Sequence, residues 1–335
     1  MRLMVITWLL ATALAGVAVS AAAAAPARAS AVGDAPAGER IALWPPGHIP
    51  GQRGVVRPPR HVQRSADPAR PDHYVEGIDA PWLAVHAPRH PNGQAVLVIP
   101  GGGYQRVVID KEGTELVPEW VDRAGYTLFV LHYRLPEAGR DRSAALADAQ
   151  RAMRLIRGQA AARGLDPQTI ATMGFSAGGH VAARLATGFD SPAYAAVDDL
   201  DRLSARPARV VLVYPVIDMG DHAHPGSRRR LLGPPGERVD ERVDEAALAE
   251  YSMQRQVRAD TPPTLLLHAA DDAAVSVDNS LLMAGALAAH GVAYELHVFA
   301  HGGHGFGMRA PAGSTTALWP ALAQRWLQGG VEARP

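Results

Sequence analysis

Short apolar runs alternate with segments of helical spacing through most of this chain, and this alternation limits how the chain can fold. The runs are too uniformly apolar for strands with one face in water, so they predict strands buried on both faces. Strands of this kind, separated by helices, predict an α/β fold with a mostly parallel central sheet and helices on both faces. The predicted strands are 95–100, 126–133, 208–216, 263–269 and 293–300, with one more leading into residue 176.

Two of the intervening segments carry a clear helical pattern. In segment 113–125 the apolar residues recur on one face, with Thr114 as the expected N-cap, Pro118 near the first turn and Gly125 as the expected stop. The second clear pattern is an amphipathic helix marked by Leu146, Ala149, Met153 and Ile156. Further helices are expected after residue 176, before the last strand and at the C-terminus.

Residues 1–29 are predicted to be an export signal, because Arg2 precedes a long apolar segment that ends in small residues, with a cleavage site after Ala29. The uncharged run is long enough to span a membrane, so an uncleaved anchor is the alternative. Its second half is mostly alanine, which is weakly hydrophobic and favours cleavage. We therefore expect a periplasmic or secreted protein without stable membrane insertion.

The mature chain is expected to form one large domain. Residues 30–73 are rich in Pro, Gly and Arg and predict an irregular lead-in with at most one short strand. Residues 74–335 predict the domain itself, with a polar excursion over the sheet at about 218–260. The 33 basic and 33 acidic side chains balance, which gives no electrostatic reason to expect nucleic acid as a partner. The sequence has no cysteine, which excludes disulfides and a thiolate nucleophile.

The stretch GFSAG at 174–178 is the first candidate for chemistry. It lies between a predicted strand and a predicted helix, so Ser176 would sit on a tight turn that needs small neighbours. Such a turn lifts the serine hydroxyl above the sheet as a nucleophile and directs backbone N–H groups to the same space. A glycine-rich bend without chemistry is the alternative.

A serine hydroxyl needs a base to accept its proton, and His304 is the preferred candidate. It lies in the HGGHGFG loop after the last predicted strand, where glycines allow a close approach to another loop. His301 in the same loop is the main rival. His180 is expected on the helix after the serine in a packing or supporting role, while His268 and His297 lie within strand patterns.

The base in turn needs a carboxylate that fixes its tautomer and stabilises its cation. Asp271 and Asp272 come directly after the predicted strand 263–269. An adjacent acidic pair is otherwise most often a solvated turn, and spacing alone does not separate the two residues. The order of serine, aspartate and histidine along the chain is that of the α/β-hydrolase fold.

The glycines of PGGGY at 100–104 follow another predicted strand and offer backbone donors for a developing oxyanion. We expect these donors to be the N–H of Gly102 or Gly103 together with that of Ala177. A phosphate-binding loop is the competing interpretation. It is rejected because no Lys-Ser/Thr pair follows and no G-x-G-x-x-G opens a helix.

Taken in order along the chain, these motifs resemble those of α/β-hydrolase-fold carbohydrate esterases of the acetyl-xylan-esterase type, often called xylanase-like. The likeness spans nearly the whole mature chain. The motifs that carry it are PGGGY (100–104), KEG (111–113), FVLHYRLP (129–136), DAQRAMRLIR (148–157), MGFSAGGH (173–180), YPVIDM (214–219), GSRRRLLG (226–233), HAADDAAVSVDNS (268–280) and GGHGFG (302–307).

The resemblance implies a serine esterase in which Ser176 is the nucleophile, Asp272 the acid and His304 the base. Asp272 belongs to an Asp-x-x-Val motif completed by Val275, so the resemblance selects it over Asp271. The implied reaction removes acetyl or other short acyl groups from plant-type polysaccharide or oligosaccharide through an acyl-enzyme on the serine.

The chain departs from the family pattern in two places. Pro100 stands where the related lipase-type motif has histidine before its glycines, which leaves the choice of oxyanion donor open. Ser276 replaces the usual proline after Val275, which should affect loop stiffness more than chemistry. Tyr104, which closes the glycine motif, is expected to contact substrate.

No metal or cofactor is expected for this reaction. Asp221, His222 and His224 have metal-binding side chains but lie in a polar loop, where we expect no metal site. The arginine run 228–230 is expected to be a solvated face, with contact to acidic sugars as the alternative.

Two other functions fit part of the pattern. A prolyl-oligopeptidase-like serine peptidase shares the serine turn and the Asp-x-x-Val loop, but such enzymes carry a large extra N-terminal domain that the irregular lead-in cannot form. A non-catalytic carbohydrate-binding protein on the same scaffold would not need all three side chains in order. An esterase is therefore the preferred hypothesis.

Overall fold

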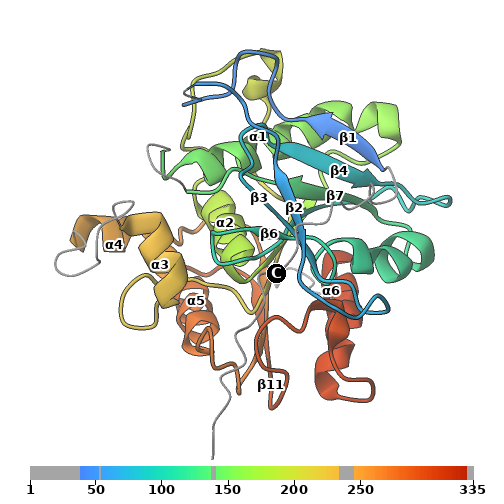
Figure 1. The fold of residues 1–335 in the computed structure, drawn as a ribbon. Coiled ribbons are helices and arrows are strands. Elements are labelled where there is room, and N and C mark those ends of the chain that lie inside the picture. The colour runs from blue at the N-terminus through green and yellow to red at the C-terminus, as the bar shows by residue number, and fades with distance from the viewer. Residues whose placement is uncertain (1–37, 53, 137–140, 234–244, 330–335) are drawn as a thin grey trace, which may run out of the picture.

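The computed structural model describes residues 38–52, 54–136, 141–233 and 245–329. The predicted export signal, 1–29, lies outside these residues. At the centre of the described chain is a sheet of eight strands in the order β1-β4-β7-β5-β8-β9-β10-β11. Figure 1 labels β1, β4 and β7 at one end of this sheet and β11 at the other. Its strands are β1 (Glu39–Ala42), β4 (Trp82–His86), β5 (Ala95–Ile99), β7 (Thr127–His132), β8 (Ala171–Phe175), β9 (Val210–Val213), β10 (Thr264–Ala269) and β11 (Tyr294–Phe299).

The strands from β7 to β11 in this order run parallel, whereas β4 pairs antiparallel with both β7 and β1. Strand β5 explains why the runs are so apolar. Ala95, Leu97 and Ile99 belong to the core on one face, Val96 and Val98 belong to the core on the other, and all are buried. The predicted α/β fold with a mostly parallel sheet is confirmed.

Helices cover both faces of the sheet (Figure 1). One core cluster joins α1 (Ala144–Gln159), α2 (Ser176–Thr187) and α5 (Asp278–Ala289) to the sheet, and a second joins the π-helix η2 (Val117–Arg123) and α6 (Trp319–Leu327). Within the described residues, no helix is both long enough and apolar enough to cross a membrane. Short 3₁₀ turns are η3 (Ala161–Arg163), η4 (Asp199–Arg202), η5 (Met253–Arg255), η6 (Gly307–Arg309) and η7 (Thr315–Leu318).

The segment that was expected to form an α-helix ending at Gly125 forms two other kinds of helix. A 3₁₀ turn, η1 (Thr114–Leu116), leads into the π-helix η2, and Thr114 makes no side-chain cap. Pro118 has no N–H, so it cannot bond to the Thr114 carbonyl as an α-helix would require. The N–H of Val117 donates to the Thr114 carbonyl instead, and this bond between residues three apart gives the tighter 3₁₀ turn. Gly125 ends the segment as expected, with a φ of 77°.

The lead-in at 30–73 is more ordered than expected where the structure describes it. Strand β1 adds an edge to the main sheet, and Trp44 is buried with its Nε1 donating to Asp148 of α1 at 2.9 Å. Strands β1 and β2 have only 4 residues each, too few for a periodic pattern in the sequence. A small antiparallel sheet consists of β2 (Arg60–Gln63), β3 (His73–Glu76) and β6 (Val107–Val108).

The polar excursion at about 218–260 contains two helices, α3 (Pro225–Leu232) and α4 (Glu245–Tyr251). They lie at one side of the molecule near α2 and α5 (Figure 1). His224 and Gly226, at the start of α3, line a cavity above the sheet. The excursion therefore forms one wall of that cavity.

Candidate active site

The loops that carry the candidate residues meet above the carboxyl ends of β5, β8, β10 and β11, where parallel sheets place ligands. A cavity of about 360 Å³ lies there. Ser176, His304, Gly102 and Gly103 line it. The structure therefore brings the predicted nucleophile, the predicted base and the glycine motif to one place.

Ser176 lies on a tight turn between β8 and α2. Its backbone φ is 51°, a left-handed value that a residue with a side chain rarely adopts. A Cβ at Gly178 would lie 2.2 Å from the carbonyl oxygen of Ile99, and one at Gly174 would lie 2.5 Å from that of Gly178. Close packing of α2 on the sheet therefore requires both glycines that flank the serine.

A line of hydrogen bonds joins the three predicted catalytic side chains. Ser176 Oγ lies 2.9 Å from His304 Nε2, and His304 Nδ1 lies 2.7 Å from Asp272 Oδ2. Because a carboxylate only accepts, Nδ1 carries the imidazole proton and Nε2 is left to accept from the serine hydroxyl. An imidazole held in this way can activate a serine hydroxyl as a nucleophile.

The environment of Asp272 favours its charged form. Burial opposes the charge, but hydrogen bonds from His268, His304 and the N–H of Val275 outweigh burial and lower the pKa of the carboxyl. His268 lies 3.3 Å from the carboxylate and the N–H of Val275 lies 2.9 Å from it. The ionised carboxylate can stabilise a protonated imidazole beside it.

His301 and Asp271, the alternatives to His304 and Asp272, form a pair at the surface. The side chain of His301 is 89% exposed, and its Nδ1 lies 3.3 Å from Asp271 Oδ2. Asp271 also accepts the N–H groups of Gly302 and Gly303 at 2.9 and 2.8 Å. This pair therefore holds the start of the loop that carries His304.

The glycine motif offers the backbone donors expected of an oxyanion hole. The N–H of Gly101 donates to the Glu112 carboxylate at 2.7 Å, so it is not available to an oxyanion. Gly102 and Gly103 line the cavity with φ values of 133° and 63°, and the described part of the chain offers neither N–H an acceptor. Ala177 lies in the first turn of α2, where N–H groups have no acceptor within the helix.

Tyr104 does not lie where a substrate contact was expected. Its side chain is 1% exposed and its hydroxyl lies 2.7 Å from His180 Nδ1. His180 Nε2 lies 2.7 Å from the carbonyl oxygen of Tyr251, so Nε2 carries the proton and Nδ1 accepts from Tyr104. A φ of 59° at Tyr104 accompanies this inward position. We correct its expected role from substrate contact to support of the glycine motif, and His180 has the supporting position that was expected.

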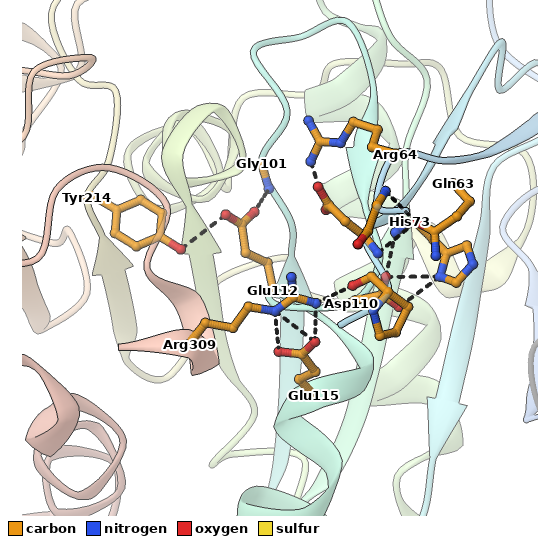
Figure 2. Close-up of polar contacts among 12 residues, drawn as sticks. Gln63, Arg64, His73, Gly101, Asp110, Glu112, Glu115, Tyr214 and Arg309 are labelled. Atoms are coloured by element: carbon orange, nitrogen blue, oxygen red, sulfur yellow. Dashed lines mark hydrogen bonds and ion pairs between the residues drawn. The ribbon is translucent and has the colours of Figure 1, made fainter. Parts of the chain in front are cut away.

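Glu112, to which the sequence assigned no role, ties two loops of the site together (Figure 2). It is 2% exposed, and its carboxylate accepts from the N–H of Gly101 at 2.7 Å and from the hydroxyl of Tyr214 at 3.1 Å. Tyr214 in turn accepts the N–H of Gly307 at 3.1 Å and packs edge-on against the ring of His304. The KEG motif was its only signal in the sequence, because a lone acidic residue carries no spacing pattern.

His224 was also missed as a residue of this site. It lines the cavity, and its Nδ1 accepts the N–H of Ser227 at 3.1 Å, which caps α3. Burial and the nearby His304 lower its pKa. The ring is therefore held neutral with its proton on Nε2, which leaves one hydrogen-bond donor available.

The other polar residues of the excursion have separate surroundings. His222 Nδ1 lies 3.2 Å from Asp278, and the described residues hold no group of three His, Cys, Asp or Glu side chains placed to bind a metal ion. Arg229 and Arg230 are exposed on α3, as expected of a solvated face, while Arg228 is half-buried.

Known proteins resemble this chain over most of its described length. A model of the BD-FAE family matches residues 83–287. An acetylxylan esterase of Xylanibacter ruminicola is 32% identical over 223 residues, which are 66% of this chain and 42% of that protein. An endo-1,4-beta-xylanase B of Butyrivibrio fibrisolvens is 37% identical over 217 residues, 63% of this chain and 32% of that protein. The chain thus spans less than half the length of these curated relatives.

Solved structures extend the likeness to nearly the whole fold. An acetyl ester-xyloside bifunctional hydrolase from Caldicellulosiruptor lactoaceticus superposes with a TM-score of 0.68 at 35% identity, covering 89% of this chain and 98% of that one. A carboxylesterase from Lactobacillus plantarum superposes with a TM-score of 0.60 at 24% identity, covering 83% and 100%, and shows the fold alone. With the observed strand order, these likenesses confirm the predicted α/β-hydrolase fold.

Proposed function

The chain belongs to the BD-FAE family, and from this premise we propose that it is an exported serine esterase that removes acetyl or other short acyl groups from plant-type polysaccharide or oligosaccharide. One observation carries the proposal: Ser176, His304 and Asp272 form a continuous line of hydrogen bonds of 2.9 and 2.7 Å at a cavity. A hydroxyl, an imidazole and a carboxylate in this order can perform acyl transfer.

In the first half-reaction, Ser176 Oγ attacks the carbonyl carbon of the ester while its proton moves to His304 Nε2. The carbonyl oxygen becomes an oxyanion, which accepts the N–H of Ala177 and that of Gly102 or Gly103. Asp272 stabilises the imidazolium that forms. The bond from carbon to the sugar oxygen then breaks, the sugar leaves as an alcohol with the proton from Nε2, and the acyl group stays on the serine.

In the second half-reaction, water takes the place of the sugar. His304 accepts a proton from the water as its oxygen attacks the acyl carbon, and the same donors hold the second oxyanion. The bond to Ser176 Oγ then breaks, and the serine regains a proton from His304 Nε2. The acid is released and the site returns to its starting state.

Support for a saccharide ester comes from the relatives and from the size of the site. The curated relatives are named as an acetylxylan esterase and a xylanase, and a similar structure as an acetyl ester-xyloside hydrolase. A cavity of about 360 Å³ is at the small end of ligand sites and suits a short acyl group. Export rests on residues 1–29, and N-terminal sequencing of the mature protein should begin at Ser30.

The reaction is tested by acetate release from acetylated xylan. We expect Ser176→Ala to lower kcat by about 10⁴-fold or more, because the acyl-enzyme cannot form. Thermal unfolding of the variant checks that the fold is kept. An unchanged rate would contradict the mechanism, whereas cleavage of a proline-containing peptide without ester hydrolysis would favour the peptidase alternative.

The base is tested by two matched histidine variants. His304→Ala should lose about 10³-fold or more near neutral pH, because no group then accepts the serine proton. His301→Ala, in the same loop but exposed, should change kcat by less than about threefold. The opposite pattern would move the assignment to His301.

A further inference from the structure

We propose that the cavity wall beside Ser176 and His304 holds a subsite for a carboxylate on the substrate, formed by Lys111 and Arg106 with Arg64 at its rim. The three cationic side chains line the same cavity as the serine and the histidine. The inference rests on the proposed esterase function and gives it a substrate class: an ester whose saccharide or acyl group carries an acid.

Lys111 is the single lysine among the 33 basic residues of the chain. Its neighbours Asp110 and Glu112 are buried and hold fixed partners, Asp110 at His73 and Glu112 at Gly101 (Figure 2). Lys111 lies between them, is only half-buried and lines the cavity. The backbone of this segment is therefore anchored on both sides of the one lysine.

The ammonium of Lys111 lies next to the loop of the base. A Cβ at Gly305 would lie 2.7 Å from Lys111 Nζ, so the ammonium rests against the residue that follows His304. The carbonyl of Lys111 also accepts the N–H of Met308 at 3.0 Å, which fixes its backbone to the same loop. A positive charge is thereby held close to the reacting groups.

Arg106 and Arg64, which also line the cavity, both lie over the ring of Tyr74. Their guanidinium carbons lie 4.7 and 5.4 Å from the ring centroid of Tyr74. Asp72 pairs with Arg64 at 2.8 Å, while Arg106 donates to the neutral side-chain amide of Gln105 at 3.3 Å. Asp72 thus balances the charge of Arg64, whereas Arg106 on the same ring has only a neutral partner, and an incoming carboxylate would supply the negative charge that Arg106 lacks.

The charge balance of the wall favours an anionic ligand. Among the residues that the structure describes, neither Lys111 nor Arg106 forms an ion pair with a carboxylate. Glu112 is the acidic side chain among the lining residues, and it keeps its negative charge because its partners Gly101 and Tyr214 are neutral, so three cationic residues line the wall with one carboxylate. A neutral acetyl sugar has no charge that uses these cations, whereas a carboxylate would be attracted and oriented by them.

The carboxylate has two chemical sources. It can belong to a uronic acid attached to the saccharide near the ester, or to the free end of a dicarboxylic acyl group such as succinyl. Both put a negative charge within a few bonds of the scissile ester, so the recognition chemistry is the same and the test separates the sources.

The test compares charged with neutral esters in two matched pairs. One pair is an acetylated xylo-oligosaccharide with and without a uronosyl branch, and the other is mono-para-nitrophenyl succinate against para-nitrophenyl acetate. Each ester is measured with the wild type, Lys111→Met, Arg106→Gln and the control Arg325→Gln. The control removes an exposed cation of α6 that does not line the cavity.

We expect Lys111→Met and Arg106→Gln each to lower kcat/KM for the charged member of at least one pair by about tenfold, with less than about twofold change for the neutral member. Arg325→Gln should change neither member. The preference of the wild type for the charged ester should shrink as salt is raised. A loss confined to the uronosyl pair assigns the carboxylate to the saccharide, and one confined to the succinate pair assigns it to the acyl group.

Equal effects on charged and neutral esters, or none on either, would overturn the subsite and leave the esterase proposal intact. Inactivity of the wild type on all the esters would overturn the proposed function instead. Calorimetric binding of both ester pairs to Ser176→Ala still decides the subsite in that case. Adding Lys111→Met to Ser176→Ala should weaken the binding of at least one charged ester and leave its neutral partner unchanged, and unchanged affinity for both charged esters overturns the subsite.

Discussion

Ser176 holds a left-handed backbone, with a φ of 51°, that costs a residue with a side chain about 1 kcal/mol or more. Glycine at this position would relieve the strain and lose the hydroxyl, whereas alanine would lose the hydroxyl and keep the strain. We therefore expect Ser176→Gly to exceed Ser176→Ala in free energy of unfolding by about 1 kcal/mol, with both variants inactive. Urea unfolding measures the difference, and equal stabilities would mean that the turn stores no strain.

Under the proposed mechanism, Glu112 would act on the reaction through the loops that it joins. Glutamine has one acceptor oxygen, so its amide group would face either the N–H of Gly101 or the hydroxyl of Tyr214 as a second donor. We expect Glu112→Gln to lower kcat about tenfold to a hundredfold with KM changed less than about threefold, because oxyanion donors act mainly in the transition state. Steady-state kinetics on a neutral acetate ester measures both constants.

Tyr214→Phe serves as a control, because it removes the hydrogen bond from Tyr214 to Glu112 and keeps the one from Gly101. Tyr214→Phe removes the link to Gly307 but leaves the carboxylate on Gly101, so its kcat should fall less than that of Glu112→Gln. Affinity for a boronic acid, which mimics the tetrahedral state, should fall in parallel with kcat. A change carried by KM alone would contradict the positioning role of Glu112.

At the scale of elements, α2 starts so close to β5 that only glycine fits at the contact. A Cβ at Gly178 would lie 2.2 Å from the Ile99 carbonyl oxygen and 2.4 Å from that of Pro100, and both are backbone atoms that cannot turn aside. We expect Gly178→Ala to lower the free energy of unfolding by about 3 kcal/mol. Activity should be lost as well, because the shift displaces Ser176 from the glycine motif.

The matched control is another helical glycine in open space. Gly285 lies exposed within α5, and an added Cβ there meets nothing within 4 Å. Gly285→Ala should raise the free energy of unfolding by about 0.5–1 kcal/mol, because alanine favours the helix. Urea unfolding compares the two variants, and similar stabilities would argue against the close approach of α2.

The sequence predicted the elements whose signal lies in their own residues. Strands buried on both faces were found because such a strand is apolar throughout, and a parallel sheet brings the loops after its strands to one edge. That rule alone places Ser176, His304 and the acid pair of Asp271 and Asp272 at the same edge of the sheet. The π-helix η2 was missed, because its form depends on the hydrogen bonds that Pro118 leaves open.

The rest of the site depends on contacts between distant segments. Glu112 accepts a hydrogen bond from Tyr214, which is 102 residues away in the sequence, and no local sequence pattern predicts that contact. Tyr104 was expected in the cavity, but its φ of 59° and its bond to His180 accompany a buried position. A positive φ at tyrosine cannot be inferred from residue type, since only glycine favours it.

At the scale of the molecule, the lead-in and the domain share one core. Asp148 of α1 accepts from Trp44 of the lead-in and pairs with Arg134 at 2.8 Å, with both charged side chains buried. Arg134 also donates to the carbonyl of Pro50. The described part of the lead-in is therefore tied to α1 and to the segment after β7 by these polar contacts, whose loss would leave a buried charge without its partners.

Two buried histidines link the stability of the whole molecule to pH. Burial lowers the pKa of both His180 and His132 to about 3. An unfolded histidine titrates near pH 6.5, so below that pH the unfolded chain binds protons that the folded chain does not. Their contribution to stability is therefore complete above about pH 6.5 and is lost progressively as the pH falls toward 3.

Within this window each histidine should lower the free energy of unfolding by about 1.4 kcal/mol per pH unit. His132 stacks on Trp82 with ring centroids 4.2 Å apart, so His132→Phe keeps an aromatic ring there but removes the titrating group. We expect urea unfolding between about pH 6 and pH 4 to show a slope smaller by about 1.4 kcal/mol per pH unit in His132→Phe than in the wild type. The difference in slope is independent of any constant loss of packing caused by the larger ring. An unchanged slope would mean that the folded protein takes up a proton at His132 as readily as the unfolded chain does.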